Sequence, residues 1–173
     1  MMQDHDPHPD GPKFSRDELV AALQTAVPGL CDVAMLWWAS ASSFITNNDT
    51  GEQLAGLKGQ RLYFIVADAR DIPRAGAAII EYLWAAGYGY FEISNSGSLL
   101  PRTIVDGSVW QTNRLDFAAG ALCRPPLYQD RGTPVIVDGT VNVVDSAVAI
   151  PDPTSEISAE AEAARAVARK EIG

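Results

Sequence analysis

Two aspartates near the N-terminus are spaced so that they could bind one divalent metal together. Asp4 and Asp6 flank His5, and in a β-strand residues i and i+2 point to the same side. Two such carboxylates repel each other, which raises the pKa of one of them, unless a cation lies between them. Hard oxygen ligands of this kind suit Mg²⁺ or Mn²⁺. The alternative is that both aspartates are solvated charges of a polar terminus.

A third carboxylate would strengthen such a site, and the sequence offers two candidates. Asp106 follows a short apolar stretch and precedes a glycine, a position at a strand end that suits a cleft. Asp116 lies further along the chain. Either aspartate could instead form a turn or pair with Arg102 or Arg114. The choice between Asp106 and Asp116 therefore stays open.

Patterns along the chain predict the elements that must position these acids. Ser15 and Glu18 match a capping box, and the helical face that follows ends at Pro28-Gly29. A second helix is predicted after Asp71, with apolar residues at helical spacing up to Gly87. Strands are expected at residues 33–38, 61–67, 88–94, 103–105, 135–137 and 141–144.

Turn residues predict two hairpins and therefore the class of fold. Residues 95–98 would join strands 88–94 and 103–105, and residues 138–140 would join the last two strands. This pattern favours an α+β fold, a mostly antiparallel sheet with flanking helices, over a doubly wound parallel sheet. We expect a core at residues 1–150, then a linker and a C-terminal helix at residues 151–173. Because the apolar face of that helix is thin, we expect it to stay exposed or to pack on something outside this chain.

Composition and charge limit the classes of function. The 173 residues are 47% hydrophobic and 20% charged, as in globular domains, and no apolar run reaches membrane-spanning length. The polar N-terminus does not resemble a signal peptide. Cys31 and Cys123 fit no metal-ligand spacing, so we interpret them as reduced thiols of a cytoplasmic protein. The net charge of −9 argues against a free nucleic-acid binder, unless carboxylates hold cations or a basic surface lies in another part of the protein.

The order of these motifs resembles the archaeo-eukaryotic primase (primase-polymerase) superfamily, in particular primase-like proteins of plasmids and integrated elements. The resemblance rests on Asp4-His5-Asp6, on residues 57–64 (LKGQRLYF) as a second motif and on residues 104–115 (IVDGSVWQTNRL) as a third. Similar DIPR and GSLLPRT stretches, here at residues 71–74 and 97–103, occur in such proteins. The family implies an RRM-like primase catalytic core and divalent-metal-dependent nucleotidyl transfer in the DNA replication of mobile elements.

The resemblance also implies a role for individual residues. Asp4, Asp6 and Asp106 would hold two Mg²⁺ or Mn²⁺ ions that bridge the nucleotide triphosphate and the 3′ oxygen of a DNA primer. Nucleotide phosphate would be bound by Lys58, Arg61 and Arg114. The cleft would be lined by Ser96, Arg102 and the backbone of Gly97.

Tryptophans could provide stacking surfaces for bases, but most of them have a simpler interpretation. We expect Trp37, Trp38 and Trp84 in the core or in an interface. Trp110 lies inside the third motif, so both stacking on a base and a place in the core are open for it.

Two departures from the family pattern lead to alternative hypotheses. Arg61 stands where the family has a histidine, and arginine cannot shuttle a proton because it stays charged. The family also has a module before the Asp-x-Asp strand, whereas this chain begins three residues before Asp4. We therefore expect an N-terminally truncated form with impaired catalysis when alone, and the acidic charge predicts weak DNA binding by this chain alone.

The alternatives involve a protein partner. The first is a non-catalytic acidic protein that binds or inhibits a nucleic-acid-binding replication protein by imitating phosphate charge. The second is a structural module of a larger replication protein.

Overall fold

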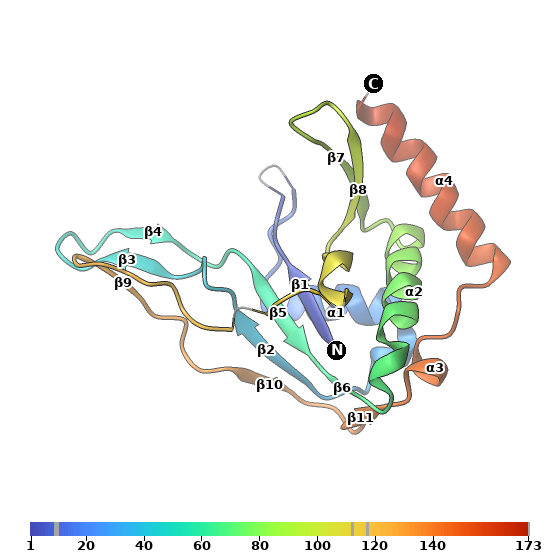
Figure 1. Cartoon of the computed structure of the whole chain (residues 1–173), viewed down its shortest axis with the longest axis horizontal. Coiled ribbons are helices and arrows are strands. Elements are labelled where there is room, and N and C mark those ends of the chain that lie inside the picture. Colours follow the sequence, from blue (N-terminus) through green and yellow to red (C-terminus); the bar gives the residue numbers. More distant parts are fainter. Residues whose placement is uncertain (9–10, 112, 117, 173) are drawn as a thin grey trace.

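The fold is built on an antiparallel sheet with helices on one face. The computed structural model describes residues 1–8, 11–111, 113–116 and 118–172. The sheet consists, in spatial order, of β1 (Met2–His5), β5 (Gln60–Tyr63), β2 (Met35–Ala39) and β10 (Val135–Val137). Its inner face is covered by α1 (Arg16–Ala26) and α2 (Ile72–Ala85) (Figure 1). The α+β class with mostly antiparallel strands is therefore confirmed.

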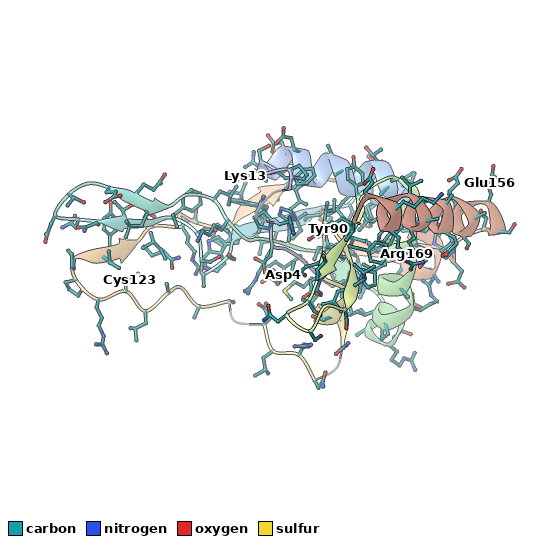
Figure 2. All side chains as sticks on the ribbon, turned by 90° about the horizontal axis from the view of Figure 1, so that it is seen from above. Asp4, Lys13, Tyr90, Cys123, Glu156 and Arg169 are labelled. Carbon is teal, nitrogen blue, oxygen red and sulfur yellow. The ribbon has the colours of Figure 1, made fainter. Side chains whose placement is uncertain are left out.

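Smaller elements surround this sheet. An arm of three strands extends to one side, and a hairpin and a long helix lie at the other (Figures 1 and 2). These elements are the arm strands β3 (Ile45–Asn47), β4 (Gln53–Ala55) and β9 (Leu127–Gln129); the hairpin β7 (Gly89–Ile93) and β8 (Leu99–Thr103); the parallel pair β6 (Ile65–Val66) and β11 (Val143–Val144); the 3₁₀ helices η1 (Pro28–Leu30), η2 (Ala69–Asp71) and η3 (Gly107–Trp110); and the helices α3 (Ser146–Ala149) and α4 (Ser155–Ile172).

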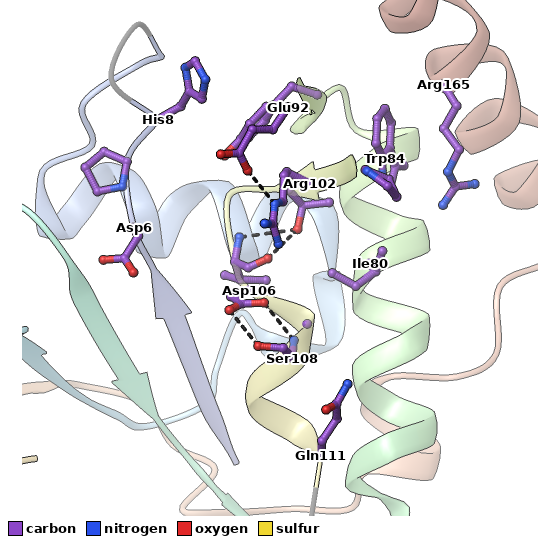
Figure 3. A pocket seen from close by; sticks show the side chains of 16 residues that line it. Asp6, His8, Ile80, Trp84, Glu92, Arg102, Asp106, Ser108, Gln111 and Arg165 are labelled. Carbon is purple, nitrogen blue, oxygen red and sulfur yellow. Dashed lines mark hydrogen bonds and ion pairs between the residues drawn. The ribbon is translucent and has the colours of Figure 1, made fainter. Parts of the chain in front are cut away.

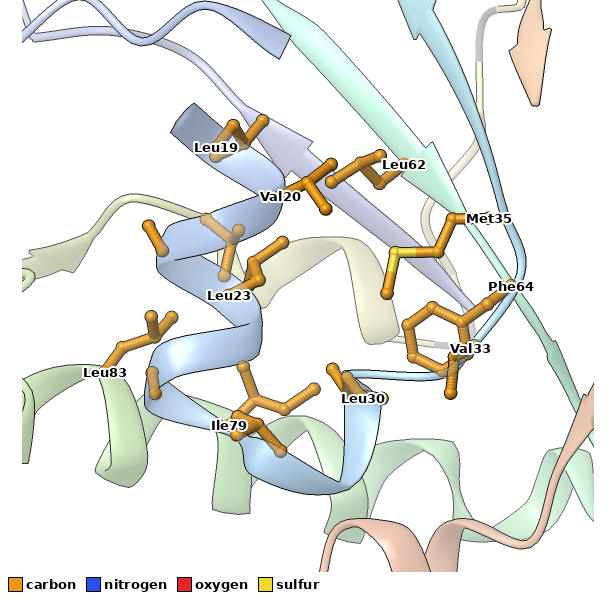
Figure 4. Close-up of a cluster of buried hydrophobic side chains, with 14 of the residues drawn as sticks. Leu19, Val20, Leu23, Leu30, Val33, Met35, Leu62, Phe64, Ile79 and Leu83 are labelled. Atoms are coloured by element: carbon orange, nitrogen blue, oxygen red, sulfur yellow. The ribbon is translucent and has the colours of Figure 1, made fainter. Parts of the chain in front are cut away.

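The hydrophobic core lies between the inner face of the sheet and the two covering helices. Alternate residues of β2 point inward, so that Met35, Trp37 and Ala39 are buried. Leucines and isoleucines of α1 and α2 pack against them (Figure 4). The start of α1 has the predicted capping box, because the Ser15 backbone N–H donates to Oε2 of Glu18 at 2.7 Å.

The predicted hairpin between the last two strands is wrong. β10 pairs with β2, and β11 pairs in parallel with β6. Between them the chain runs beside residues 32–34, where the Ala34 N–H donates to the Val141 carbonyl at 2.9 Å. A Cβ at Gly139 would overlap the Ala34 backbone, so this glycine permits a close approach and not a reversal.

The long strand predicted at residues 61–67 is interrupted. Phe64 turns its ring into the core and separates β5 from β6. Ile65, inside the predicted strand, is 63% exposed, although its apolar neighbours would suggest a buried strand. The sequence of this stretch does not show where the strand changes its pairing partner, because no polar residue marks the break between β5 and β6.

The C-terminal helix is also not isolated, contrary to the prediction. Ala161 of α4 is fully buried against Trp84 of α2 and Phe91 of β7. Arg165 bonds both oxygens of Glu81, at 3.0 and 2.5 Å, and lies over the Trp84 ring. Small residues and an arginine stem thus replace the wide apolar stripe that helix packing usually needs. None of the helices in the described part of the chain has the length and apolar character needed to cross a bilayer.

Trp110 lies in the core, which decides between the two roles open to it. Its indole N–H donates to the Met2 carbonyl at 2.7 Å, and its ring lies on Gly76 of α2. A Cβ at Gly76 would overlap this ring. The buried ring cannot stack on a base while the chain is folded.

We predict that Gly76→Ala destabilises the protein, although alanine is normally favoured over glycine inside a helix by about 1 kcal/mol. The added methyl group must displace Trp110, and such overpacking costs roughly 1–3 kcal/mol. Urea unfolding measures the difference. Ala77→Gln, on the exposed neighbouring position, is the control and should change stability by less than about 0.5 kcal/mol. A more stable Gly76→Ala variant would contradict the packing of Trp110 on α2.

Candidate functional site

The free edge of β1 brings Asp106 next to the N-terminal aspartates. β1 pairs with β5 on one side only. On its other side the Asp4 carbonyl accepts the Asp106 N–H at 2.8 Å, and the Met2 carbonyl accepts the Trp110 indole N–H. Residues about a hundred positions apart are thereby joined by one backbone–backbone hydrogen bond and by one from an indole N–H to a backbone carbonyl.

The Asp4 carboxylate is held in an unfavourable place for a negative charge. Its side chain is only 17% exposed, on the outer face of the sheet. Burial raises the pKa of Asp4, the charge of Asp6 raises it further, Arg61 opposes both, and Asp106 adds a smaller increase. The carboxylates of Asp4, Asp6 and Asp106 are therefore close enough to influence one another electrostatically.

The two other carboxylates are held by loops. Asp6 lies just beyond the end of β1, over Gly59, where a Cβ would overlap both Oδ1 of Asp6 and Oγ of Ser40. Asp106 caps η3, since its two oxygens accept the backbone N–H and the hydroxyl of Ser108, each at 2.8 Å. Gly59, in the second motif, thus leaves room for the carboxylate of Asp6, in the first motif.

Arg61 lies on the outer face directly opposite Asp4 in the β1–β5 register. Its Nε is 3.5 Å from Oδ1 of Asp4, and its Nη1 donates to Oδ1 of Asp116 at 2.7 Å. The Tyr63 hydroxyl donates to the second oxygen of Asp116 at 2.8 Å. Asp116 therefore approaches the site as the partner of a cation, whereas Asp106 joins the cluster of acids.

A cavity of about 540 Å³ opens beside the aspartates. Figure 3 shows Asp6 on the loop after β1 and Asp106 at the start of η3, with Arg102 of β8 above them. Arg102 pairs with Glu92 of β7 at 2.9 Å. Arg165 of α4 forms part of the far wall. The cavity is therefore lined by charges of both signs together with apolar side chains such as Ile80 and Trp84.

The structure brings some predicted site residues together and leaves others apart. Asp4, Asp6, Asp106 and Arg61 cluster at the end of β1, and Arg102 lines the adjacent cavity. The others lie outside the lining of this cavity: Lys58 is exposed before β5, Ser96 bonds Ser94 and Ser98 at the hairpin tip, and Arg114 is exposed after η3.

Some residues of the site were missed by the sequence analysis. Glu92 was missed because the second hairpin strand was predicted at residues 103–105; the observed β8 (Leu99–Thr103) puts Arg102 opposite Tyr90 and diagonal to Glu92. Arg165 could not have been found, because the helix that carries it was expected not to pack on this chain. His5 was identified only as the middle of the motif; it points inward, and its Nδ1 is 2.6 Å from the Ile104 carbonyl. Burial lowers the pKa of His5, so its imidazole is neutral at pH 7.

The donor atoms fit a hard divalent cation, although the ligand set is not assembled. Oδ1 of Asp4 is buried and accepts no hydrogen bond of usual length from the described residues, and the Arg61 guanidinium 3.5 Å away compensates its charge only in part, since the pKa of Asp4 is still raised. Within the described ranges, however, no three carboxylate, imidazole or thiol side chains are arranged to hold one metal ion. The Asp106 oxygens already accept two hydrogen bonds from Ser108, and a carboxylate can keep such bonds while it ligates a metal.

Comparison with known proteins provides no relative. The chain matches no protein-family model, no curated protein and no solved structure. The geometry of its own residues must therefore support any functional conclusion.

We predict that Asp4→Asn stabilises the metal-free protein at pH 7. Because the pKa of Asp4 is raised in the folded state, its carboxyl group stabilises the fold when protonated and loses that contribution as the pH rises through the folded pKa. Asp4→Asn should therefore increase the free energy of unfolding most near neutral pH and less towards pH 4. Urea titrations at several pH values measure this difference.

Asp71→Asn is the control for this experiment and should lower the free energy of unfolding at pH 7. Arg74 and Ser146 lower the pKa of Asp71 to about 2, so its ionised form stabilises the fold at pH 7. If Asp4→Asn also destabilised the protein at pH 7, the electrostatic conflict at Asp4 would be refuted.

Proposed function

We propose that this chain is a primase-polymerase-like domain for divalent-metal-dependent nucleotidyl transfer in mobile-element DNA replication. The observation that supports the proposal best is the cluster of Asp4, Asp6 and Asp106, whose members come from motifs about a hundred residues apart. Mutual repulsion makes such a cluster costly, so its presence favours a cation-binding role over a structural one.

The roles proposed for the residues follow from their positions. Asp4, Asp6 and Asp106 would hold Mg²⁺ or Mn²⁺, which would stabilise negative charge on the triphosphate. Arg102, already in the cavity, would bind phosphate, and Arg61 would do so from the sheet. Lys58, Ser96 and Arg114 lie outside the cavity, so we propose that they contact only a larger ligand such as a DNA strand.

The sheet itself is consistent with an RRM-like primase core. Helices cover its inner face, while acids and Arg61 lie on the other face or at the end of an edge strand. The outer face is partly covered by the segment that carries Asp116, so we propose that a nucleotide approaches from the end of β1 beside the cavity. The Arg61 guanidinium would act there only as a fixed positive charge, since it cannot transfer protons at neutral pH.

Metal-dependent nucleotide binding is the first test of this function. We expect the wild-type chain to bind Mn²⁺, and then a nucleoside triphosphate, in calorimetric titrations. Asp106→Asn removes one of the charges that would hold the metal and should weaken Mn²⁺ binding at least about tenfold, or about 1.4 kcal/mol.

Asp145→Asn provides a matched control for Asp106→Asn. Asp145 also caps a helix, since it accepts the Ala147 N–H at 3.1 Å, but it does not line the cavity. The Asp145→Asn substitution should leave Mn²⁺ affinity unchanged. Absence of Mn²⁺-dependent nucleotide binding, or equal effects of the two substitutions, would count against the proposal and favour an acidic protein that binds a replication partner.

A further inference from the structure

A second cavity, of about 360 Å³, opens between the loop after β1 and the strand β7, and we call it the aromatic pocket. Its size lies within the range of about 300–1,000 Å³ that is usual for small-molecule sites. Aromatic side chains form much of its wall: His5, His8, Phe14, Tyr88, Tyr90 and Phe91. The aromatic pocket therefore offers ring surfaces, in contrast to the charged side chains of the cavity beside the aspartates.

The rings in this wall meet edge to face and do not stack on one another. The rings of His8 and Tyr90 lie 5.3 Å apart with 66° between their planes, and those of Phe14 and Tyr88 lie 6.4 Å apart at 64°. The side chains of Phe14, Tyr88 and Tyr90 are only partly buried. Ring faces are therefore available to a planar ligand, and stacking on such faces is a usual way of binding a nucleobase.

His5 brings a polar atom to this apolar wall. Its ring is buried, and its Nδ1 lies 2.6 Å from the Ile104 carbonyl, which can only accept a hydrogen bond. In the neutral imidazole Nδ1 therefore carries the proton, and Nε2 has a lone pair that can accept. Nε2 is buried and has no hydrogen-bond partner among the described residues, which is costly for such an acceptor. A ligand with an N–H donor would remove this cost.

The aromatic pocket adjoins the cavity beside the aspartates, because Asp6, His8 and Tyr90 line both. Arg102 lies directly opposite Tyr90 in the β7–β8 register and lines the second of these spaces. Its Nε donates to Glu92 at 2.9 Å, while its two terminal nitrogens make no hydrogen bond within the described part of the chain. These nitrogens can donate to a phosphate group. A ring on Tyr90 and a phosphate at Arg102 would thus be neighbours, as they are in a nucleotide.

We propose that the aromatic pocket binds the base of a nucleotide: the base stacks on Tyr90, its exocyclic amino group donates to Nε2 of His5, and Arg102 binds the phosphate. The ligand must combine a planar heteroaromatic ring, an amino donor and an anionic group, and an adenine nucleotide has all three. The choice of a nucleotide rests on the proposed function, whereas the pocket, the His5 acceptor and Arg102 require no metal ion.

The experiment is a calorimetric titration of the full chain with AMP, without metal, at pH 7. We expect saturable binding that shifts the amide signals of Gly87 and Gly89 in NMR spectra, because both glycines line the aromatic pocket. Purine riboside 5′-monophosphate has the same ring without the amino group and should bind at least about tenfold more weakly, since it leaves Nε2 of His5 unpaired. Absence of AMP binding, or equal affinity for the two nucleotides, would overturn the inference.

Two substitutions of one tyrosine test the stacking. Tyr90→Leu removes the aromatic face and should weaken AMP binding at least about tenfold, whereas Tyr90→Phe keeps the ring and should change it less than about twofold. Tyr128→Leu is the matched control, because Tyr128 lies on β9 of the arm, outside the aromatic pocket, and should leave the affinity unchanged. Equal effects of the two leucine variants would refute stacking on Tyr90. If urea midpoints show that Tyr90→Leu does not fold, the comparison of the two nucleotides on the wild type decides.

Arg102→Gln separates the phosphate contact from the base contact. It removes the cation beside the aromatic pocket and should weaken AMP binding at least about fivefold, but leave the affinity for adenosine unchanged. An equal loss for both ligands would refute the phosphate contact.

Failure of the base site can be distinguished from failure of the proposed function, because AMP is titrated without metal and the triphosphate with Mn²⁺. If AMP binds as expected but Mn²⁺-dependent triphosphate binding is absent, nucleotidyl transfer is refuted and the base site stands. If Mn²⁺-dependent triphosphate binding is present but insensitive to Tyr90→Leu, the base site alone is refuted.

Discussion

The hydrogen bonds along the outer edge of β1 hold the functional region together. A four-residue edge strand has little stability of its own. Here the Asp106 N–H and the Trp110 indole N–H, at the two ends of the η3 segment, bond β1 carbonyls on the side away from β5. Those bonds determine where Asp106 lies relative to Asp4, and they also bury Trp110 on α2. The cluster of acids and the helical layer are therefore coupled through one short strand.

The alternation of side chains along β1 explains why an acidic site can border a stable core. Gln3 and His5 face inward and are buried, whereas Asp4 faces outward beside Arg61. One partly buried carboxylate thus lies near other acids, which lowers the stability of the fold locally. The core formed by α1, α2 and the sheet can compensate for this loss of stability. Costs of this kind are typical of sites retained for binding or chemistry.

Local features of the fold could be predicted from the sequence, whereas those that depend on distant partners could not. The capping box at Ser15 and the hairpin of β7 and β8 need only neighbouring residues, and both are present, although the second hairpin strand lies at Leu99–Thr103 and not at residues 103–105. The partners of β10 and the docking of α4 depend on surfaces formed by other elements. Likewise, the motifs indicated Asp4, Asp6 and Asp106, but the bond between Asp116 and Arg61 follows from how a loop crosses the sheet.

The walls of the cavity come from both ends of the described chain, since Asp6 follows the first strand and Arg165 lies on the last helix. A nascent chain leaves the ribosome N-terminus first, at about 5–20 residues per second. The first acids therefore emerge long before α4 can dock on Trp84. During translation the growing polypeptide therefore lacks one wall of this cavity, which is completed only after Arg165 has been synthesised.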